Sequence, residues 1–370
     1  MKNLPKISNG VDIKKELPGV KGNVLLKDYT TFKIGGPAKY FLVAKNKEDI
    51  IKAILVAKKF HPVRDYRDNK KAQRKQISNG VKLPFFVLGG GSNLLVSDKG
   101  CNGLVIKVKS QKSKVKKNQI FCEAGVPLAR LVQISIKKNL TGLEWGVGIP
   151  GTVGGAIAGN AGAFKKSIGD SVIKVEVYDP KDNKIKIFKK INCKFGYRDS
   201  VFKEKKNQST KQNFVLGRAH KIMCSDLVIL SAIIQLKKGK KSEIKRKIKE
   251  FLDYRQETQP LNFPSAGSVF KNVKFANLHK FTSNITNKKI REICGKFGDI
   301  REIPAGWLIE RCNLKGKKIG KAKISEKHAN FILNLGGAKA RDIKKLINLI
   351  KKKVKEKFGI TLEEEIQYLF

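Results

Sequence analysis

The sequence predicts an α+β protein with more than one domain. Its 370 residues exceed the length of one ordinary domain. Segments with strand-like alternation and segments with helical spacing follow one another along the chain, without an internal repeat. Hydrophobic residues make up 41% of the chain, which is enough to bury a core and argues against global disorder.

The N-terminal part of the chain contains a helix signal and a short strand signal. Asn46 is a suitable N-cap for a helix over residues 46–60, with Asp49 at the capping-box distance. Its apolar face consists of Ile50, Ile51, Ile54 and Leu55. Residues 84–88 then form an apolar strand that leads directly into a glycine turn. Between them, residues 62–82 are basic and match no regular pattern, which is typical of a solvated loop or an insertion.

The middle of the chain favours strands. Residues 121–124 form a strand, and Pro127 is expected as the first residue of a helix that carries Leu128, Leu131 and Val132. Residues 172–178 and 184–191 alternate on either side of a turn and predict a hairpin. Residues 203–221 are again lysine-rich and are interpreted as an insertion or a divergent segment. Residues 227–236 are apolar but too short to span a membrane, so we expect a buried strand.

The C-terminal part predicts two helices and a last strand. Ser242 is expected to cap a helix with an apolar face of Ile244, Ile248, Phe251 and Leu252. Apolar residues keep helical spacing from Ile343 to Phe358, and Gly359 is placed to end that helix. Residues 360–370 are strand-like and contain three consecutive glutamates, at positions 363–365.

The net charge of +48 raises the possibility of a nucleic-acid-binding protein. The lysines are spread along the whole chain, however, and no zinc-finger spacing, RRM signature or KH loop is present. The N-terminus lacks the apolar core of a signal peptide, and no segment is long enough for a membrane span. The six cysteines form no CxxC pair. We therefore expect a cytoplasmic protein with reduced thiols, no membrane span, no specific nucleic-acid partner and no metal site.

Glycine is concentrated in two places, at 89–91 and in 142–162. Glycine lets a backbone approach a ligand closely, and successive backbone N–H groups can bind phosphate. Gly146, Gly148 and Gly151 formally match the dinucleotide-binding pattern, but Pro150 interrupts it and no apolar strand precedes it. Two glycine loops favour a large ligand that carries a pyrophosphate; the alternative interpretation is two ordinary tight turns.

Eight blocks, in order along the chain, resemble one known family. They are TFKIGGPA (31–38), LGGGSNL (88–94), GIPGTVGGAIAGNAGA (148–163), FGYRDSVFK (195–203), PSAGSVFKN (264–272), AGWLIERCNLKG (305–316), HANFILN (328–334) and LEEEI (362–366). The family is that of the UDP-N-acetylenolpyruvoylglucosamine reductases, also called UDP-N-acetylmuramate dehydrogenases. The resemblance covers nearly the whole chain from about residue 21. It is similar to the type that lacks the tyrosine loop over the substrate.

The resemblance implies a two-subdomain FAD-binding region, of the vanillyl-alcohol-oxidase/PCMH-like class, and a C-terminal α+β substrate-binding domain. The expected boundaries are 1–108, 109–236 and 237–358, with residues 359–370 returning to the active site. It also implies non-covalent FAD, NADPH as co-substrate, and a UDP-sugar enolpyruvyl ether as substrate. That reaction belongs to peptidoglycan precursor synthesis in the bacterial cytoplasm. We expect a monomer.

The resemblance implies three reacting side chains. Ser268 matches the family's proton donor, and Arg198 offers a planar fork for the carboxylate on which charge builds up. Glu365 matches the family's late glutamate and is expected to polarise the intermediate together with Arg198. The alternatives are a turn serine, an ordinary surface arginine and the wrong member of the three adjacent glutamates.

The remaining predicted contacts fall into two groups. The cofactor group is Thr31, Ile34, Gly35, Gly89, Gly90, Gly91, Ser92, Asn93, Ile149, Gly151, Thr152 and Gly155. The substrate group is Tyr197, Lys271, Asn272, Lys315 and His328. The chain departs from the family at Val273, where proline is usual, and at Asn313, where glycine is frequent and a positive φ is expected.

Two other functions are compatible with the sequence. A basic protein that binds nucleic acid or a membrane surface would explain the charge, and its affinity would fall steeply with salt. Another flavin oxidoreductase on the same fold would explain the glycine loops. Such enzymes commonly attach FAD through His or Cys, and neither residue occurs in 89–93 or 146–163.

Overall fold

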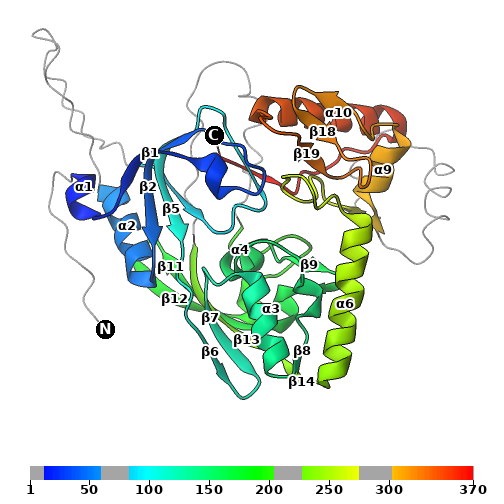
Figure 1. The fold of residues 1–370 in the computed structure, drawn as a ribbon. Coiled ribbons are helices and arrows are strands. Elements are labelled where there is room, and N and C mark those ends of the chain that lie inside the picture. The colour runs from blue at the N-terminus through cyan, green and yellow to red at the C-terminus, as the bar shows by residue number, and fades with distance from the viewer. Residues whose placement is uncertain (1–11, 60–82, 204–226, 275–301, 370) are drawn as a thin grey trace, which may run out of the picture. The chain divides into compact units, whose positions relative to one another are not determined.

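The computed structural model describes residues 12–59, 83–203, 227–274 and 302–369 (Figure 1). The predicted insertion at 62–82 and nearly all of that at 203–221 lie outside these ranges. The chain forms two compact units. Unit 1 comprises Met1–Val24, Ala38–Gly89 and Cys101–Lys241, and unit 2 comprises Leu25–Pro37, Gly90–Gly100 and Ser242–Phe370. The four-part domain division stays a prediction.

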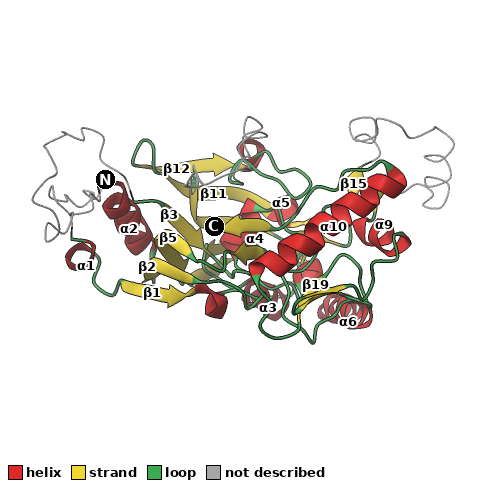
Figure 2. Ribbon diagram, turned by 90° about the horizontal axis from the view of Figure 1, so that it is seen from above, coloured by secondary structure: helices red, strands yellow, loops and turns green. Residues whose placement is uncertain are grey.

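The first sheet of unit 1 has the strand order β1-β2-β5-β3. Its strands are β1 (Lys21–Leu25), β2 (Pro37–Ala44), β5 (Cys101–Val108) and β3 (Phe85–Leu88), and β5 runs parallel to both β2 and β3. Helix α2 (Lys47–Lys59) accompanies this sheet (Figures 1 and 2). As predicted, Asn46 accepts a hydrogen bond from the Asp49 amide at 2.7 Å, and Ile50 and Ile54 are fully buried.

The second sheet of unit 1 is antiparallel throughout, in the order β12-β11-β13-β7-β6. Its strands are β12 (Lys184–Lys189), β11 (Val172–Asp179), β13 (Val228–Gln235), β7 (Gln119–Glu123) and β6 (Ser113–Lys116). The hairpin β11–β12 and the buried strand β13 are confirmed. Helix α3 (Leu128–Lys137) is also confirmed, although Pro127 occupies its N-cap and not its first helical position. Pro127 has a helical φ of −58°, but its ψ of 136° is extended, so the helix begins one residue later.

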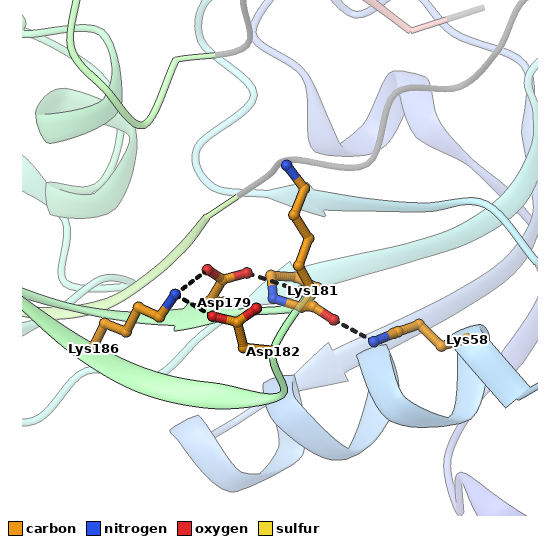
Figure 3. A network of polar contacts seen from close by, with 6 residues as sticks. Lys58, Asp179, Lys181, Asp182 and Lys186 are labelled. Atoms are coloured by element: carbon orange, nitrogen blue, oxygen red, sulfur yellow. Dashed lines mark hydrogen bonds and ion pairs between the residues drawn. The ribbon is translucent and has the colours of Figure 1, made fainter.

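An ion pair and hydrogen bonds join α2 to the hairpin β11–β12, and Figure 3 shows Lys58 of α2 beside the turn of this hairpin. Lys58 donates to the carbonyl of Pro180 and to Asn183 Oδ1, the latter at 2.8 Å. Lys47 lies 3.3 Å from Glu176 at the other end of α2. Within the turn, Lys186 bridges Asp179 and Asp182. The turn that follows β11 is therefore stabilised by its own ion pairs and by hydrogen bonds from α2.

Short elements complete unit 1. They are α1 (Ile13–Glu16), β8 (Leu140–Thr141), η2 (Glu144–Gly146), α4 (Val153–Ala158), β9 (Gly162–Ala163), β10 (Lys166–Ser167), α5 (Ile168–Ser171), η3 (Lys190–Cys193) and β14 (Lys237–Lys238). The strands among them pair antiparallel as β9 with β10 and β8 with β14. The glycine-rich segment 142–162 thus contains two short helices and the start of a hairpin.

Helix α6 (Lys241–Thr258) differs from the prediction in two details. It begins at Lys241, so Ser242 lies inside the helix and is not its N-cap. Its predicted apolar face is only partly covered, because Ile244 is buried whereas Leu252 is 41% exposed. The buried position near its end is instead Arg255. Helical spacing alone could not show how much of this face would meet a partner element.

Unit 2 is built on helix α10 (Ala340–Phe358), which packs on the sheet of β17 (Lys318–Ile319), β18 (Ala322–Ile324) and β19 (Ile332–Asn334) (Figure 2). The predicted apolar face of α10 is buried, and Gly359 ends the helix with a φ of 70°. Unit 2 also contains η1 (Leu26–Tyr29), α9 (Ala305–Arg311) and the pair β15 (Val273–Lys274) and β16 (Glu302–Ile303). Its core includes Phe32, Ile34 and Leu95 from the N-terminal half of the chain.

The C-terminal strand is shorter than predicted. Only β20 (Gln367–Leu369) is a strand, and it pairs in parallel with β4 (Leu94–Val96). Residues 360–366 are irregular apart from a bridge between Glu364 and Phe270. The reason is that this segment changes partner, from the 268–271 segment to β4, within a few residues. No helix in the described ranges has the length and apolar character that a membrane crossing requires.

Candidate active site

The first glycine turn follows β3 directly and leaves no room for side chains. A Cβ atom at Gly89 would lie 2.6 Å from Thr152 Oγ1, and the Lys107 ammonium donates to the Gly89 carbonyl. In unit 2, Gly91 has a φ of 65°, and a Cβ there would lie 2.1 Å from the carbonyl oxygen of Tyr29. Glycine is therefore required at both positions, and Gly90, Ser92 and Asn93 continue the same turn.

The second glycine-rich segment brings its backbone close to the 123–128 segment. Leu128 donates to the Gly151 carbonyl at 3.0 Å, and a Cβ at Gly154 would lie 2.9 Å from that of Ala124. Thr152 caps α4 by accepting a hydrogen bond from the Gly155 amide at 3.4 Å. Ile149 precedes this turn and is half-buried. Thr152 is thus the residue of this segment that meets the first glycine turn.

Thr31 has a buried hydroxyl beside the first glycine turn. Its hydroxyl is buried and makes no hydrogen bond within the described part of the chain. Its amide donates to the Gly91 carbonyl at 3.1 Å, which places it beside the glycine turn in unit 2. Gly35, nearby, has a φ of 146° and abuts Val96. Ile34 instead packs its side chain into the core of unit 2, where it is 2% exposed.

Arg198 lies in a tight turn that is fastened to the second glycine-rich segment. Its φ of 52° is unusual for a residue with a side chain. Gly196 and Asp199 pair on either side of it, and Asn160 donates to the Gly196 carbonyl at 2.7 Å. Ser200 donates to the Ala158 carbonyl at 2.7 Å. The ring of Tyr197 lies 5.5 Å from the guanidinium of Arg198. Hydrogen bonds therefore connect the Arg198 turn directly to the second glycine-rich segment within unit 1.

Ser268 and Glu365 lie on neighbouring segments of unit 2. The Glu365 amide donates to the carbonyl of Val269, the residue after Ser268, at 2.8 Å. On the other side, the side chain of Asn330 bonds both the amide and the carbonyl of Phe270, at 2.9 and 2.8 Å. Gly267 has a φ of 73°, and no atom lies within 4 Å of a Cβ built there. The space beside Gly267, the residue before Ser268, is therefore open.

The three consecutive glutamates have different surroundings. Glu363 forms an exposed ion pair with Lys271 at 2.6 Å, and Glu364 pairs with Lys351 at 2.7 Å. The backbone of Glu365 is fixed on two sides, since its carbonyl also accepts a hydrogen bond from Asn93 Nδ2 at 3.0 Å. The first two carboxylates thus have lysine partners, and the third has the most firmly held backbone.

The predicted substrate residues of unit 2 divide into two small groups. Lys271 is the ion-pair partner of Glu363, and Asn272 accepts a hydrogen bond from the Ala305 amide at 3.2 Å, at the start of α9. Lys315 pairs with Glu310 at 2.7 Å. His328 packs beside Gly306, and burial lowers the pKa of its ring below the ordinary value.

The structure confirms one conformational prediction and shows three contacts that the sequence did not predict. Asn313 has the expected positive φ, 56°. In contrast, the contacts that Asn160, Asn330 and Lys107 make were missed, because each joins backbone groups that are distant in sequence. Asn160 follows a glycine, which is a weak turn signal. Asn330 and Lys107 gave no such signal.

Arg198 lies in unit 1, and Ser268 and Glu365 lie in unit 2. The structure thus brings together Ser268 with Glu365, and Arg198 with the glycine-rich segment. The convergence of all three stays a prediction. No group of three or more potential metal ligands occurs within the described ranges.

Comparison with known proteins identifies the family. Residues 74–187 match the family described as "FAD binding domain", and residues 259–369 match "UDP-N-acetylenolpyruvoylglucosamine reductase, C-terminal domain". A UDP-N-acetylenolpyruvoylglucosamine reductase of Caldanaerobacter subterraneus subsp. tengcongensis is 37% identical over 346 residues, which are 93% of this chain and 92% of the relative. The chain belongs to the UDP-N-acetylenolpyruvoylglucosamine reductase family.

Other members of the family also match nearly the whole chain. The reductase of Thermotoga maritima is 35% identical and covers 92% of this chain and 96% of its own. The crystal structure of the reductase from Thermus caldophilus superposes with a TM-score of 0.66 at 29% identity, over 95% of this chain and 99% of the other. The resemblance noted in the sequence and the predicted fold class are therefore confirmed.

Membership also confirms the cofactor and the enzyme class, an FAD-dependent oxidoreductase. The local structure fits this cofactor. The Thr31 hydroxyl is buried and has no hydrogen-bond partner among the described residues, which suits a polar ligand beside the glycine turn. The region matched to the FAD family contains both Gly89 and Thr152.

Proposed function

We propose that this protein reduces the enolpyruvyl ether of UDP-N-acetylglucosamine enolpyruvate to give UDP-N-acetylmuramate. NADPH is the electron source, and the reaction serves peptidoglycan precursor synthesis in the cytoplasm. The observation that supports the proposal is the hydrogen bond from the Glu365 amide to the carbonyl of Val269, the residue after Ser268, in a chain of this family. We also propose that the protein is a monomer and has no specific nucleic-acid partner.

The cofactor is proposed to lie against the glycine segments. Bound FAD, once reduced, supplies the hydride for the addition to the double bond. Its contacts are assigned to the backbone of 89–93, to Ile149, Gly151, Thr152 and Gly155, and to the segment with Thr31, Ile34 and Gly35. Glycine at 89 and 91 lets the turn pack closely against Thr152 and Tyr29, and the Thr31 hydroxyl supplies a hydrogen bond. Ile34 contributes through its backbone, since its side chain lies in the core.

The substrate is anionic, and the surrounding side chains suit it. Arg198 is assigned to the carboxylate of the enolpyruvyl group, where negative charge increases as hydride arrives. Glu365 is assigned to the same reacting group, and its fixed backbone limits where its carboxyl group can lie. Tyr197, Lys271, Asn272, Lys315 and His328 are assigned to the nucleotide sugar and its phosphates. Lys271 then exchanges its ion pair with Glu363 for the ligand.

Ser268 is assigned as the proton donor to the carbon beside the one that receives hydride. A hydroxyl is a weak acid, so it protonates only a strongly basic centre such as a carbanion-like intermediate. The open side at Gly267 leaves room for the substrate to approach this hydroxyl. The backbone of residues 269–270 is held in place, because Asn330 and Glu365 form hydrogen bonds with it on both sides.

The test replaces Ser268 with alanine and follows the two halves of the reaction separately. We expect Ser268→Ala to leave flavin reduction by NADPH intact, and to lower product formation by about 10²–10⁴-fold, the usual contribution of a positioned proton donor. Ser265→Ala, which removes another hydroxyl of the same loop, serves as the matched control and keeps turnover near the wild-type rate.

Unchanged turnover in Ser268→Ala would remove Ser268 from the mechanism. The wild-type protein must also oxidise NADPH faster when the enolpyruvyl nucleotide sugar is present. If the rate does not depend on that sugar, the chain is another flavin oxidoreductase and the proposed substrate is wrong.

A further inference from the structure

Lys107 lies at the end of β5 beside the first glycine turn. In the parallel pairing of β5 with β3, Lys107 is opposite Leu88, the last residue of β3. Its ammonium donates to the carbonyl of Gly89, the next residue along the chain. A lysine from a neighbouring strand therefore holds the first peptide of the turn. All of these residues belong to unit 1.

The ammonium of Lys107 is poorly solvated and has a neutral partner. Burial, and to a lesser degree repulsion from Lys109, lower the pKa of Lys107 below its ordinary value. No carboxylate forms an ion pair with it in the part of the chain that the structure describes. A carbonyl accepts the hydrogen bond but does not neutralise the charge. A desolvated cation of this kind is stabilised when an anion binds nearby.

The peptide that Lys107 holds is also where the two glycine segments of unit 1 meet. Thr152 Oγ1 would lie 2.6 Å from a Cβ at Gly89, so the Thr152 side chain packs directly on the Gly89 backbone. A shift of the Gly89 carbonyl would therefore disturb Thr152, which caps α4. Lys107 opposes such a shift from the side of the sheet, and it brings a positive charge to this junction.

We propose that Lys107 is a positioning residue of the FAD site, which holds the Gly89 peptide and provides positive charge for the FAD pyrophosphate. The proposal rests on the assignment of the first glycine turn to FAD. It adds a charged side chain to a site whose other predicted contacts are backbone groups and neutral side chains. It acts through Gly89 and takes no part in the chemical step.

The experiment compares three variants of the full-length chain, prepared as apoprotein and titrated with FAD. Lys107→Met keeps the aliphatic stem and removes the charge, and Lys107→Arg keeps the charge. Lys109→Met removes the neighbouring exposed lysine of the same strand end and is the matched control. Flavin fluorescence gives the FAD Kd, and thermal unfolding of each apoprotein reports on the fold. Each titration is made at about 50 and about 500 mM NaCl, because salt weakens contacts between charges.

We expect the FAD Kd of Lys107→Met to rise about 10–100-fold, the range of a hydrogen bond to a charged group. The apoprotein of this variant keeps its unfolding temperature, because a desolvated charge has been removed. Its Kd depends less on salt than that of the wild type. Lys107→Arg recovers most of the affinity, and Lys109→Met binds FAD as the wild type does.

The inference is wrong if Lys107→Met binds FAD within about twofold of the wild type. It is also wrong if the loss of affinity is matched by a loss of apoprotein stability with unchanged salt dependence, since the role would then be structural. A wild-type protein that binds no FAD would contradict the cofactor assignment itself, so the two failures are distinguishable.

Discussion

Thr31 and Ser110 carry buried hydroxyls that make no hydrogen bond within the described residues. Such a group costs free energy in the folded protein, because it has left water without a replacement. The two differ in place. Thr31 is bonded to the glycine turn through its amide, whereas Ser110 lies against Gly125 in unit 1 and is not among the predicted cofactor residues. The first hydroxyl suits a ligand, and the second has no such explanation.

This difference predicts that two similar substitutions stabilise the apoprotein alike but differ in their effect on FAD affinity. Thr31→Val should stabilise the apoprotein by about 1 kcal/mol and weaken FAD binding by about fivefold or more, because the hydroxyl is then absent when FAD arrives. Ser110→Ala should stabilise the apoprotein similarly and leave the FAD Kd unchanged. Thermal unfolding and FAD titration of both variants measure this. Equal FAD affinity in Thr31→Val and the wild type would show that the Thr31 hydroxyl does not bind FAD.

At the scale of elements, the two glycine-rich segments of unit 1 form one contact between Gly89 and Thr152. The side chain of Thr152 packs there on the backbone of Gly89, more than sixty residues away in the chain. One segment follows a parallel strand, and the other precedes the short helix α4. Neither could change its local conformation without the other.

The contact predicts that substitutions at the two positions are coupled. Gly89→Ala should lower FAD content strongly, because its methyl group displaces Thr152 from the start of α4. Thr152→Ala alone should cost about 1 kcal/mol, as expected for a lost N-cap. The double variant should bind more FAD than Gly89→Ala does, since the clash is gone. FAD content and unfolding temperature of all four proteins complete the cycle.

A suitable control is Gly159→Ala, at the other end of α4 and outside the predicted cofactor group, because no atom lies closer than 3.6 Å to a Cβ built there. This variant should retain most of its FAD. If the effects of Gly89→Ala and Thr152→Ala simply add, the two segments are independent, and the close contact has no energetic consequence.

For the molecule as a whole, the net charge of +48 is the most unusual property. Family membership accounts for the FAD cofactor and the enzyme class but not for this charge. Lysines lie on many exposed positions of both units, for example on the outer face of α10. A charge of this kind attracts any polyanion at low salt without a dedicated site.

We therefore predict that the protein binds duplex DNA weakly and without sequence preference. Its affinity should fall by at least about tenfold between about 50 and about 200 mM salt, because binding releases counterions from the DNA. FAD-loaded protein should behave in the same way. Fluorescence anisotropy with two unrelated duplexes measures both properties. Tight, sequence-dependent binding at the higher salt would favour the nucleic-acid-binding alternative.

The sequence alone was enough for the elements whose pattern is local. Helices α2 and α10, the hairpin β11–β12 and the buried strand β13 follow from hydrophobic periodicity and turn residues, and the motifs were sufficient to predict the family and FAD. The errors concern edges of elements, namely Pro127, Ser242 and the length of the last strand. Element ends depend on which neighbours cover them, and one sequence does not contain that information.

Only the tertiary structure decided which distant groups meet. Asn93 bonds the backbone of Glu365 across 272 positions in the chain, and lysines 271 and 351 distinguish the two preceding glutamates. It also placed Lys107 beside Gly89 and Phe32 in the core of unit 2. The physical reason is that periodicity and turn preference act between near neighbours in the chain. A hydrogen bond between remote segments exists only once the intervening chain has packed.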